Sequence, residues 1–260
     1  MDIQELFGVS GKVAIVTGGS RGIGAMIARG LVTNGVRTYI TARKAEACDA
    51  MAAELSDVGE CISIPADLAD AEGLAAFVAA FTEREDGLDI LVNNAGAAWG
   101  APFGQFPESG FDKVLNVNVR APFMLTQALQ DQLTARATHE DPARVIMTGS
   151  VDGMVVPFGD NYSYSASKAA IHMLARHMAH HLARLNITVN SIAPGPFESK
   201  MMSYVLDDPE RRAVAVESVP RRRIGTPEDV AGAVIFLASR AGAYLTGAVI
   251  PVDGGLSTHG

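Results

Sequence analysis

A glycine-rich turn follows the first apolar segment of the chain and reads Thr17-Gly18-Gly19-Ser20-Arg21-Gly22-Ile23-Gly24. An apolar segment with helical spacing comes directly after it, so the turn joins a strand to a helix. Glycine permits positive φ and lets main-chain N–H groups approach a phosphate at the positive end of a helix dipole. A purely structural turn is the alternative, because the spacing is Gly-x-x-x-Gly-x-Gly rather than Gly-x-Gly-x-x-Gly. We predict a dinucleotide-phosphate site, with contacts from Gly18, Ser20, Arg21, Gly22, Ile23 and Gly24.

Short apolar, β-branched segments alternate along the chain with longer alanine-rich segments that have helical spacing. We expect strands at 12–17, 36–41, 61–65, 88–92, 144–148, 187–192 and 248–251. We expect helices near 22–34, 44–56, 70–85, 108–134, 162–185 and 227–238. The strands are nearly continuous apolar runs, which is typical of strands covered on both faces. The alternation predicts an α/β fold of the Rossmann type, a doubly wound parallel seven-stranded sheet with helices on both faces.

The sequence contains no repeat, low-complexity tract or linker that divides its 260 residues, so we expect one domain over 1–260. The least regular part is 194–226, which is long for a connection inside a compact domain. We interpret this segment as a substrate-covering lid. The residues Thr226-Pro227-Glu228-Asp229 then supply the hydroxyl, the proline and the acidic first turn that begin a helix.

The end of the second expected strand reads Tyr39-Ile40-Thr41-Ala42-Arg43-Lys44 and lacks an acidic residue. Sites that prefer NAD place Asp or Glu here for the ribose 2′-hydroxyl, whereas a 2′-phosphate needs cations. Arg43 and Arg21 can converge on one phosphate, which suits guanidinium geometry. The alternative is that both arginines are solvated surface residues. The sequence therefore favours NADP(H) as the cofactor.

Composition narrows the classes of partner and the compartment. A formal net charge of −8 argues against nucleic-acid binding, which depends on attraction to phosphates. The sequence has no apolar run long enough for a membrane span and no signal-peptide pattern at residues 1–5. Cys48 and Cys61 lack metal-ligand spacing, and we interpret both as core thiols in a reducing compartment. We expect a cytoplasmic protein that binds neither nucleic acid nor membranes.

Five motifs occur together in an order and spacing that resemble the short-chain dehydrogenase/reductase family. They are the turn at 17–24, Asn93-Asn94-Ala95-Gly96, Ser150, Tyr164-Ser165-Ala166-Ser167-Lys168 and Pro194-Gly195. A single motif of this kind can arise by chance, whereas five in register along nearly the whole chain are hard to explain otherwise. The resemblance implies hydride transfer between a nicotinamide cofactor and a carbonyl or secondary alcohol. It also implies a homotetramer built through the helices near 108–134 and 162–185.

Tyr164 and Lys168 are four residues apart, so they share one face of a helix. A phenol ordinarily has a pKa of ~10, and a neighbouring ammonium lowers that pKa toward the range useful in acid–base catalysis. Tyr164 can then give a proton to a carbonyl oxygen or remove one from an alcohol. Ser150 ends the fifth expected strand, where parallel sheets bind their ligands. By resemblance, Ser150 hydrogen-bonds the substrate oxygen and Asn118 holds a water that links the lysine to solvent.

The resemblance also implies cofactor contacts beyond the glycine turn, at Asp67, Leu68, Asn94, Ala95, Gly96, Tyr164, Lys168, Pro194, Gly195 and Ser199. Asp67 matches a family position at the adenine, and a helix N-cap is the alternative for this residue. Family members commonly have a threonine that binds the nicotinamide carboxamide. Ser199 stands at the corresponding place here and keeps the hydroxyl, whereas Asn93 is expected to be mostly structural.

Four histidines lie on the expected helix 162–185, namely His172, His177, His180 and His181. His177 and His181 have metal-ligand spacing, but no carboxylate or cysteine motif accompanies them. We interpret the four as a solvated or interface face and predict no metal site.

We expect NADPH-dependent reduction of a carbonyl to a secondary alcohol. The segments 17–24, 64–68, 99–101 and 242–244 resemble 3-oxoacyl reductases of the family, which implies a β-ketoacyl thioester carried on CoA or acyl carrier protein. Reduction of another ketone, a sugar or a steroid is the alternative, because this fold hosts many substrates. A non-catalytic dinucleotide-binding sensor or scaffold is a further alternative. The complete set Asn118, Ser150, Tyr164 and Lys168 argues against that last possibility.

Overall fold

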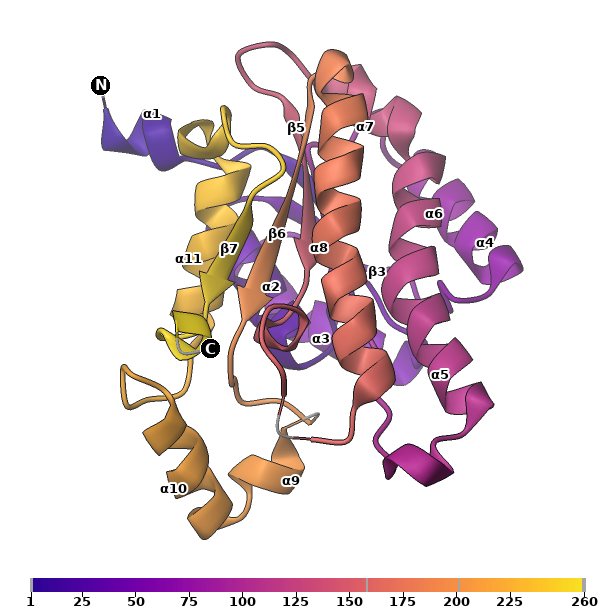
Figure 1. The fold of residues 1–260 in the computed structure, drawn as a ribbon. Helices are drawn as coiled ribbons and strands as arrows, with labels where there is room; N and C mark the ends of the chain where they lie inside the picture. Colours follow the sequence, from indigo (N-terminus) through magenta and orange to yellow (C-terminus); the bar gives the residue numbers. More distant parts are fainter. Residues whose placement is uncertain (1, 158, 201, 259–260) are drawn as a thin grey trace.

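The computed structural model describes residues 2–157, 159–200 and 202–258. These residues form one sheet of seven parallel strands in the order β3-β2-β1-β4-β5-β6-β7 (Figure 1). The predicted α/β fold is confirmed, and each expected strand is present with ends shifted by at most a few residues. The strands are β1 (Val13–Thr17), β2 (Arg37–Thr41), β3 (Cys61–Ser63), β4 (Ile90–Asn93), β5 (Ala143–Thr148), β6 (Ile187–Pro194) and β7 (Val249–Val252).

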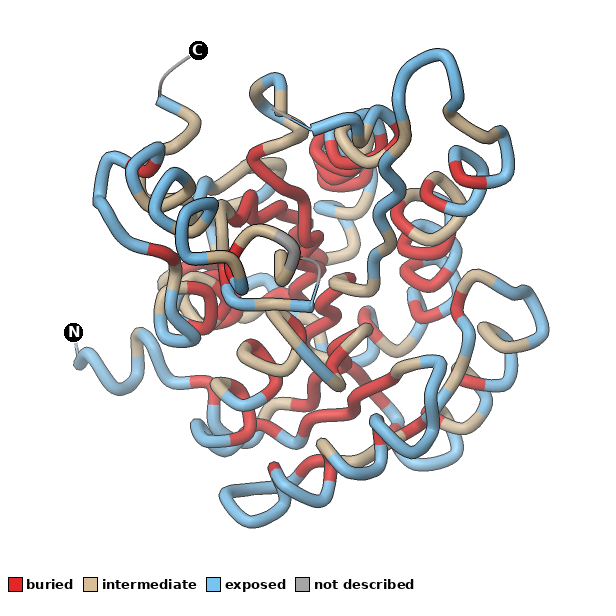
Figure 2. The backbone as a smooth tube through the Cα atoms, turned by 90° about the horizontal axis from the view of Figure 1, so that it is seen from below, coloured by how far each residue is buried: buried red, intermediate tan, exposed pale blue. Residues whose placement is uncertain are grey.

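Helices cover both faces of the sheet, so the strands are buried from two sides (Figures 1 and 2). Strand β1 shows the alternation, because Ala14 and Val16 pack with one apolar cluster and Val13 and Ile15 with the other. The first cluster lies against α2 (Gly22–Thr33), α3 (Ala45–Ser56) and α11 (Pro227–Ala238). The second lies against α4 (Ala71–Thr82), α6 (Ala121–Ala128), α7 (Gln130–Arg136) and α8 (Tyr162–Leu182).

The helix expected over 108–134 is interrupted, which corrects the prediction of one continuous helix. It divides into α5 (Glu108–Leu115), a π-helical turn η2 (Asn116–Arg120), α6 and α7. Pro122 has no N–H and cannot donate to the oxygen of residue 118, so the regular hydrogen-bond pattern fails here. The N–H of Ala121 bonds instead to the oxygen of Asn116, five residues back. The interruption therefore lies at the predicted site residue Asn118.

The segment 194–226 is more regular than predicted. It contains α9 (Ser203–Leu206) and α10 (Pro209–Ser218), and these helices project below the sheet in Figure 1. The Asp208 carboxylate accepts hydrogen bonds from the N–H groups of Glu210 and Arg211 and so caps α10. Proline and an acidic first turn follow the cap at α10, as they do at the start of α11 that the sequence correctly indicated. At α11 the cap is a capping box, in which the Asp229 carboxylate accepts from the Thr226 N–H at 2.8 Å.

A short N-terminal helix, α1 (Ile3–Phe7), was not predicted. Cys48 and Cys61 are buried and unpaired, as expected.

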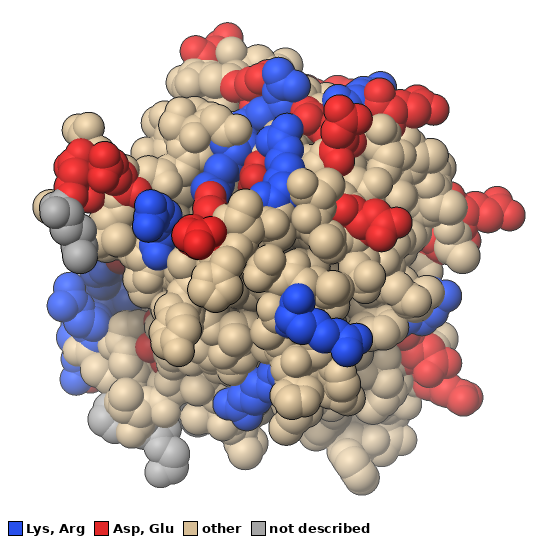
Figure 3. Space-filling model, turned by 90° about the horizontal axis from the view of Figure 1, so that it is seen from above, with Lys and Arg blue, Asp and Glu red and all other residues tan. Residues whose placement is uncertain are grey.

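On the face shown in Figure 3, acidic and basic side chains lie next to one another. None of the described helices is both long and apolar enough to cross a membrane.

Candidate active site

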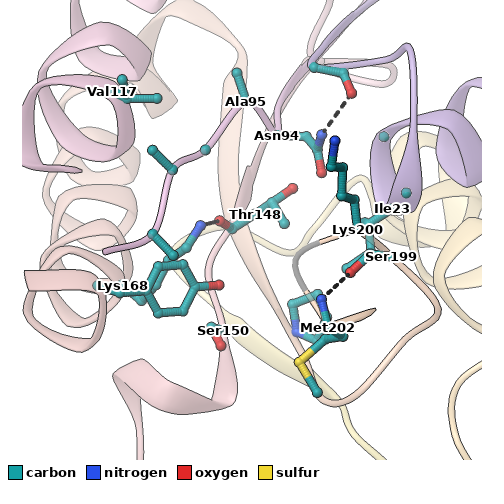
Figure 4. A pocket seen from close by; sticks show the side chains of 18 of the residues that line it. Ile23, Asn94, Ala95, Val117, Thr148, Ser150, Lys168, Ser199, Lys200 and Met202 are labelled. Carbon is teal, nitrogen blue, oxygen red and sulfur yellow. Dashed lines mark hydrogen bonds between the residues drawn. The ribbon is translucent and has the colours of Figure 1, made fainter. Parts of the chain in front are cut away.

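A cavity of about 1500 Å³ opens at the carboxyl ends of the strands. It is bounded by the turn after β1, the ends of β4, β5 and β6, the first turns of α8, and α9 and α10. Figure 4 shows Lys168, Thr148 and Ser150 on one side of this cavity, with Ser199, Lys200 and Met202 facing them. Open parallel sheets bind their ligands at this edge because the connecting loops converge there.

The glycine turn forms one end of the cavity. Gly18 and Gly22 have φ of +66° and +54°, which other residues adopt only with strain. A Cβ on Gly22 would point across the cavity to within 3.2 Å of the Ser199 Cβ. Helix α2 begins at Gly22 without a side-chain N-cap, so its first N–H groups are available to a ligand.

Asn94 ties this turn to the end of β4. Its Nδ2 donates to the main-chain oxygen of Thr17 at 2.9 Å, and the Thr17 hydroxyl accepts from the N–H groups of Asn94 and Ala95. Asn93 donates instead to Thr126 within the core, which is the structural role expected of it. The segment 94–96 is therefore held beside the glycine turn.

Cations lie after β1 and β2, and an acid lies after β3. Arg21, Arg43 and Lys44 line the cavity, and so do Asp67 and Leu68. The Asp67 carboxylate accepts from the N–H of Ala69, within a turn. The alternative assignment of Asp67 as a helix N-cap is wrong, because Asp70 caps α4 through the N–H of Gly73.

Lys168 is buried where α8 meets the end of β5. Its Nζ donates to the main-chain oxygen of Thr148 at 2.7 Å and lies 5.4 Å from the ring centroid of Tyr164. Burial lowers the pKa of Lys168 to about 8, and the carboxylate of Asp152 opposes this shift. Tyr164 lines the cavity one turn earlier on the same helix face, as the spacing predicts.

Ser150 lies two residues after the end of β5 and borders the same cavity. Its backbone is extended, and its hydroxyl oxygen accepts from the N–H of Asp152 at 3.1 Å. The hydroxyl proton is not used by that contact, so Ser150 can still donate to a ligand oxygen. Ser150 and Tyr164 thus line one wall with Lys168.

Asn118 is the one predicted site residue that does not line the cavity. Its Nδ2 donates to the oxygen of Ala97 and to the hydroxyl of Ser167, both at 2.9 Å. Its Oδ1 accepts from the N–H of Ala97 at 2.8 Å. A Cβ on Gly96 would lie 3.5 Å from this Oδ1 and 3.8 Å from the Nζ of Lys168. Asn118 therefore braces the 94–97 segment close to the lysine.

The end of β6 completes the cofactor side of the cavity. Pro194, Gly195 and Ser199 all line it. The hydroxyl of Ser199 accepts from the N–H of Met202 at 3.3 Å and retains its proton for a ligand. All the predicted cofactor residues thus border this one cavity, namely Gly18, Ser20, Arg21, Gly22, Ile23, Gly24, Arg43, Asp67, Leu68, Asn94, Ala95, Gly96, Tyr164, Lys168, Pro194, Gly195 and Ser199.

The rest of the cavity is mainly apolar, and most of its lining comes from the segments 97–108, 151–161 and 196–217. The apolar lining residues include Trp99, Val151, Met202, Val205, Val214 and Leu256. Lys113 also lines this part, with its Nζ 5.6 Å from the centroid of the Trp99 ring. The space suits an apolar chain attached to a polar reacting group.

Sequence reasoning missed two residues at the site. Asp152 lines the cavity, and burial raises the pKa of its carboxyl while a hydrogen bond from Asn161 opposes that shift. His172 is buried behind Ser150, which corrects its assignment to a solvated or interface face. His177, His180 and His181 are exposed. In the described part of the chain, no group of three or more His, Cys, Asp or Glu side chains is arranged to hold a metal ion.

Comparisons with known proteins agree with this architecture. A family model described as enoyl-(acyl carrier protein) reductase matches residues 18–257. The chain is 47% identical over 253 residues to the rhamnolipids biosynthesis 3-oxoacyl-[acyl-carrier-protein] reductase of Pseudomonas aeruginosa, covering 97% of this chain and 99% of that protein. It is 33% identical over 257 residues to the 5-keto-D-gluconate 5-reductase of Escherichia coli, covering 98% of each.

A solved structure shows the same likeness in three dimensions. The RhlG/NADP active-site complex of Pseudomonas aeruginosa superposes with a TM-score of 0.95 at 47% identity, covering 97% of this chain and 99% of that one. The resemblance to 3-oxoacyl reductases, and among them to the rhamnolipid enzyme, is thereby confirmed. With matches over nearly its whole length and the five motifs gathered around one cavity, the chain belongs to the short-chain dehydrogenase/reductase family.

Proposed function

We propose that this protein reduces a 3-oxoacyl thioester to the 3-hydroxyacyl thioester with NADPH. The observation that carries the proposal is the buried ammonium of Lys168, 5.4 Å from the ring centroid of Tyr164, at a cavity that Ser150 also lines. A cation in this position favours the phenolate form of tyrosine and so tunes it for proton transfer. Similarity to a 3-oxoacyl reductase supports the substrate class.

The residues at the glycine turn fit NADP(H). Gly22 leaves open the gap toward Ser199, and the uncapped start of α2 offers N–H groups for a pyrophosphate. Arg21 of the glycine turn and Arg43 and Lys44 after β2 border the cavity, and the end of β2 carries no acidic residue that would repel a 2′-phosphate. When bound, the cofactor supplies the hydride.

We assign the remaining chemistry to the side chains on the wall formed by β5 and α8. Ser150 donates a hydrogen bond that fixes the substrate carbonyl, and Tyr164 transfers a proton to the oxygen as negative charge develops there. Lys168 stabilises the phenolate that remains. Asn118 braces the segment beside Lys168, and Oδ1 keeps one lone pair for a water that returns the proton from solvent.

We propose that 194–226 covers the substrate. Met202, Val205, Val214 and Ala215 of this segment line the cavity, and an apolar acyl chain would bury them. A substrate arriving on CoA or acyl carrier protein would enter beside this segment. Closure of such a segment excludes water from the reacting carbonyl.

We also retain a homotetramer and a cytoplasmic location as proposals. Phe123 and Met124 on α6 and Met173 on α8 are exposed apolar side chains on the helices expected to form the interfaces. The free thiols of Cys48 and Cys61 fit a reducing compartment. Sedimentation velocity of the purified protein tests the tetramer directly.

An NADPH-oxidation assay with a panel of substrates tests the proposed function. We expect turnover with acetoacetyl-CoA and longer 3-oxoacyl thioesters. We expect little with 5-keto-D-gluconate, the substrate named for the Escherichia coli relative, or with crotonyl-CoA, an enoyl thioester. Preference for the sugar would favour the alternative carbonyl substrate. Tight NADPH binding without turnover of any carbonyl would favour a sensor or scaffold.

A further inference from the structure

His172 extends the stripe of functional side chains along α8. Tyr164, Lys168 and His172 are spaced by four residues, so they follow one another on the same face of the helix. Tyr164 and Lys168 line the cavity, whereas His172 lies behind it and is only 6% exposed. A titratable side chain buried this deeply has to be satisfied by partners in the core.

Both ring nitrogens of His172 have partners that define its tautomer. Nε2 lies 3.0 Å from the main-chain oxygen of Ser150, and Nδ1 lies 2.9 Å from the hydroxyl of Ser191 on β6. A carbonyl oxygen only accepts, so Nε2 carries the proton. Burial lowers the pKa of His172 and so favours the neutral ring, in which Nδ1 is an acceptor. The Ser191 hydroxyl lies 2.9 Å from Nδ1 and 3.2 Å from the main-chain oxygen of Met147, so Nδ1 is the nearer acceptor for its proton.

The Ser150 carbonyl is thus held by two donors. The N–H of Gly153 donates to it at 3.1 Å from within the turn that follows, and His172 donates from the helix behind. Two lone pairs are available on a carbonyl oxygen, and both are used. The peptide that follows Ser150 is fixed in orientation by these contacts, and the hydroxyl of Ser150 projects from the same residue.

Gly149 is matched to the histidine ring. A Cβ built on Gly149 would lie 2.1 Å from Cε1 of His172 and 2.8 Å from each ring nitrogen. No side chain fits at position 149 while the imidazole occupies this place. His172 therefore lies directly against the backbone that connects β5 to Ser150.

We propose that His172 is a positioning residue, which fixes the backbone of Ser150 from behind so that its hydroxyl meets the substrate oxygen. This inference rests on the proposed role of Ser150. The imidazole links β6 to the end of β5 through Ser191 and the Ser150 carbonyl, and the absence of a side chain at Gly149 makes room for it. His172 touches neither substrate nor cofactor.

The variant H172L removes the donor and keeps an apolar side chain in the core. We expect kcat for acetoacetyl-CoA to fall about tenfold, the effect of one lost hydrogen bond in a preorganised site. The dissociation constant for NADPH, measured by fluorescence, should stay within about twofold because the cofactor half of the cavity is untouched. The isotope effect of C4-deuterated NADPH on kcat should be larger for H172L than for the wild type. H177L is the matched control, since His177 is exposed on the same helix.

Rescue separates a positioning role from a packing role. In H172Q the amide nitrogen reaches as far as the imidazole Nε2, so kcat should return to within about threefold of wild type. In H172N the side chain is too short to reach the Ser150 carbonyl, so the loss should persist. Equal kcat for H172Q and H172N would overturn the proposal, and this comparison remains decisive if H172L fails to fold.

Gly149 supplies a second, independent test. G149A should lose most activity, because the new Cβ collides with the ring of His172. The double variant G149A/H172A removes that collision and should recover at least about tenfold in kcat over G149A alone. No recovery in the double variant would contradict the proposed contact between the two residues.

S150A distinguishes failure of this inference from failure of the proposed function. If S150A keeps wild-type kcat, the role of Ser150 itself is wrong. If S150A is inactive while H172L stays within about twofold of wild type, Ser150 acts as proposed and only the role of His172 is refuted.

Discussion

The Nζ of Lys168 donates a 2.7 Å hydrogen bond to the main-chain oxygen of Thr148, the last residue of β5. This contact joins α8 to the end of β5, two residues before Ser150. The ammonium is held there at the expense of its solvation, since burial lowers the pKa of Lys168 to about 8. Lys168, which we propose activates Tyr164, is thus held as a buried ammonium, and its burial costs solvation free energy.

Lys168→Met should stabilise the free protein while removing activity. The pKa falls from 10.5 to about 8 on folding, which corresponds to about 3 kcal/mol against the charged form. Loss of the hydrogen bond to Thr148 offsets part of this, so we expect a net gain of ~1–2 kcal/mol in the free energy of unfolding at pH 7. Urea denaturation of the wild type and of Lys168→Met measures this difference in the free energy of unfolding.

The pH dependence of that gain has a definite sign. Between pH 8 and 10.5 the folded wild type binds fewer protons than the unfolded chain, so its stability rises with pH in this window. The advantage of Lys168→Met should therefore shrink over the same range. A difference in stability that does not change from pH 7 to 10 would show that Lys168 is not perturbed by burial.

Arg43→Ala should weaken NADPH selectively. A charged hydrogen bond to the 2′-phosphate is worth about 1.5–3 kcal/mol, so we expect KM for NADPH to rise roughly tenfold to a hundredfold. KM for NADH should change by less than about twofold. Arg29→Ala is the control, because Arg29 pairs with Glu54 on the outer surface of α2. Equal effects on both cofactors would refute 2′-phosphate recognition by Arg43.

Two glycine-to-alanine changes should act on different properties: Gly24→Ala should weaken NADPH binding, and Gly232→Ala should stabilise the fold. A Cβ on Gly24 would lie 2.3 Å from the oxygen of Gly18, so Gly24→Ala should distort the phosphate turn and raise the NADPH dissociation constant at least about tenfold. Gly232 lies on α11 with open space around a Cβ, so Gly232→Ala should raise the free energy of unfolding by about 0.5–1 kcal/mol. Fluorescence titration and thermal denaturation test the pair.

Val214→Asp should discriminate among acyl chain lengths. Val214 is 69% exposed yet lines the cavity from α10, where an acyl chain would bury it. We expect kcat/KM for 3-oxodecanoyl-CoA to fall about tenfold, because the chain must desolvate the carboxylate, and that for acetoacetyl-CoA to fall less than about twofold. Ala213→Asp serves as control on the same helix outside the cavity. A uniform loss would argue against the proposed lid.

The sequence predicted the sheet and most of the cavity for a physical reason. Parallel strands buried on both faces are continuous apolar runs, and residues such as Ser150 and Asp67 follow them at one edge of the sheet. Helix α10 was missed although Asp208 and Pro209 form a helix start of the kind recognised at Thr226. The start of α10 therefore has a local signal in the sequence.

Other features depend on tertiary packing and have no local signal. The contact of His172 with Gly149 joins α8 to the end of β5, and neither residue indicates the other in the sequence. The π-helical turn at Asn118 depends on Pro122, which is compatible with the first turn of an α-helix as well as with an interruption. Placing such residues requires knowing which elements meet.

The central claim is that Tyr164 supplies the proton in an NADPH-dependent carbonyl reduction, and Tyr164→Phe tests it most directly. The measurement is the rate of NADPH oxidation with saturating acetoacetyl-CoA, together with the NADPH dissociation constant of the same preparation. We expect that constant to stay within about twofold of wild type and kcat to fall by at least about a hundredfold, the usual contribution of a general acid. A variant that binds NADPH normally and keeps kcat within about threefold of wild type would contradict the account.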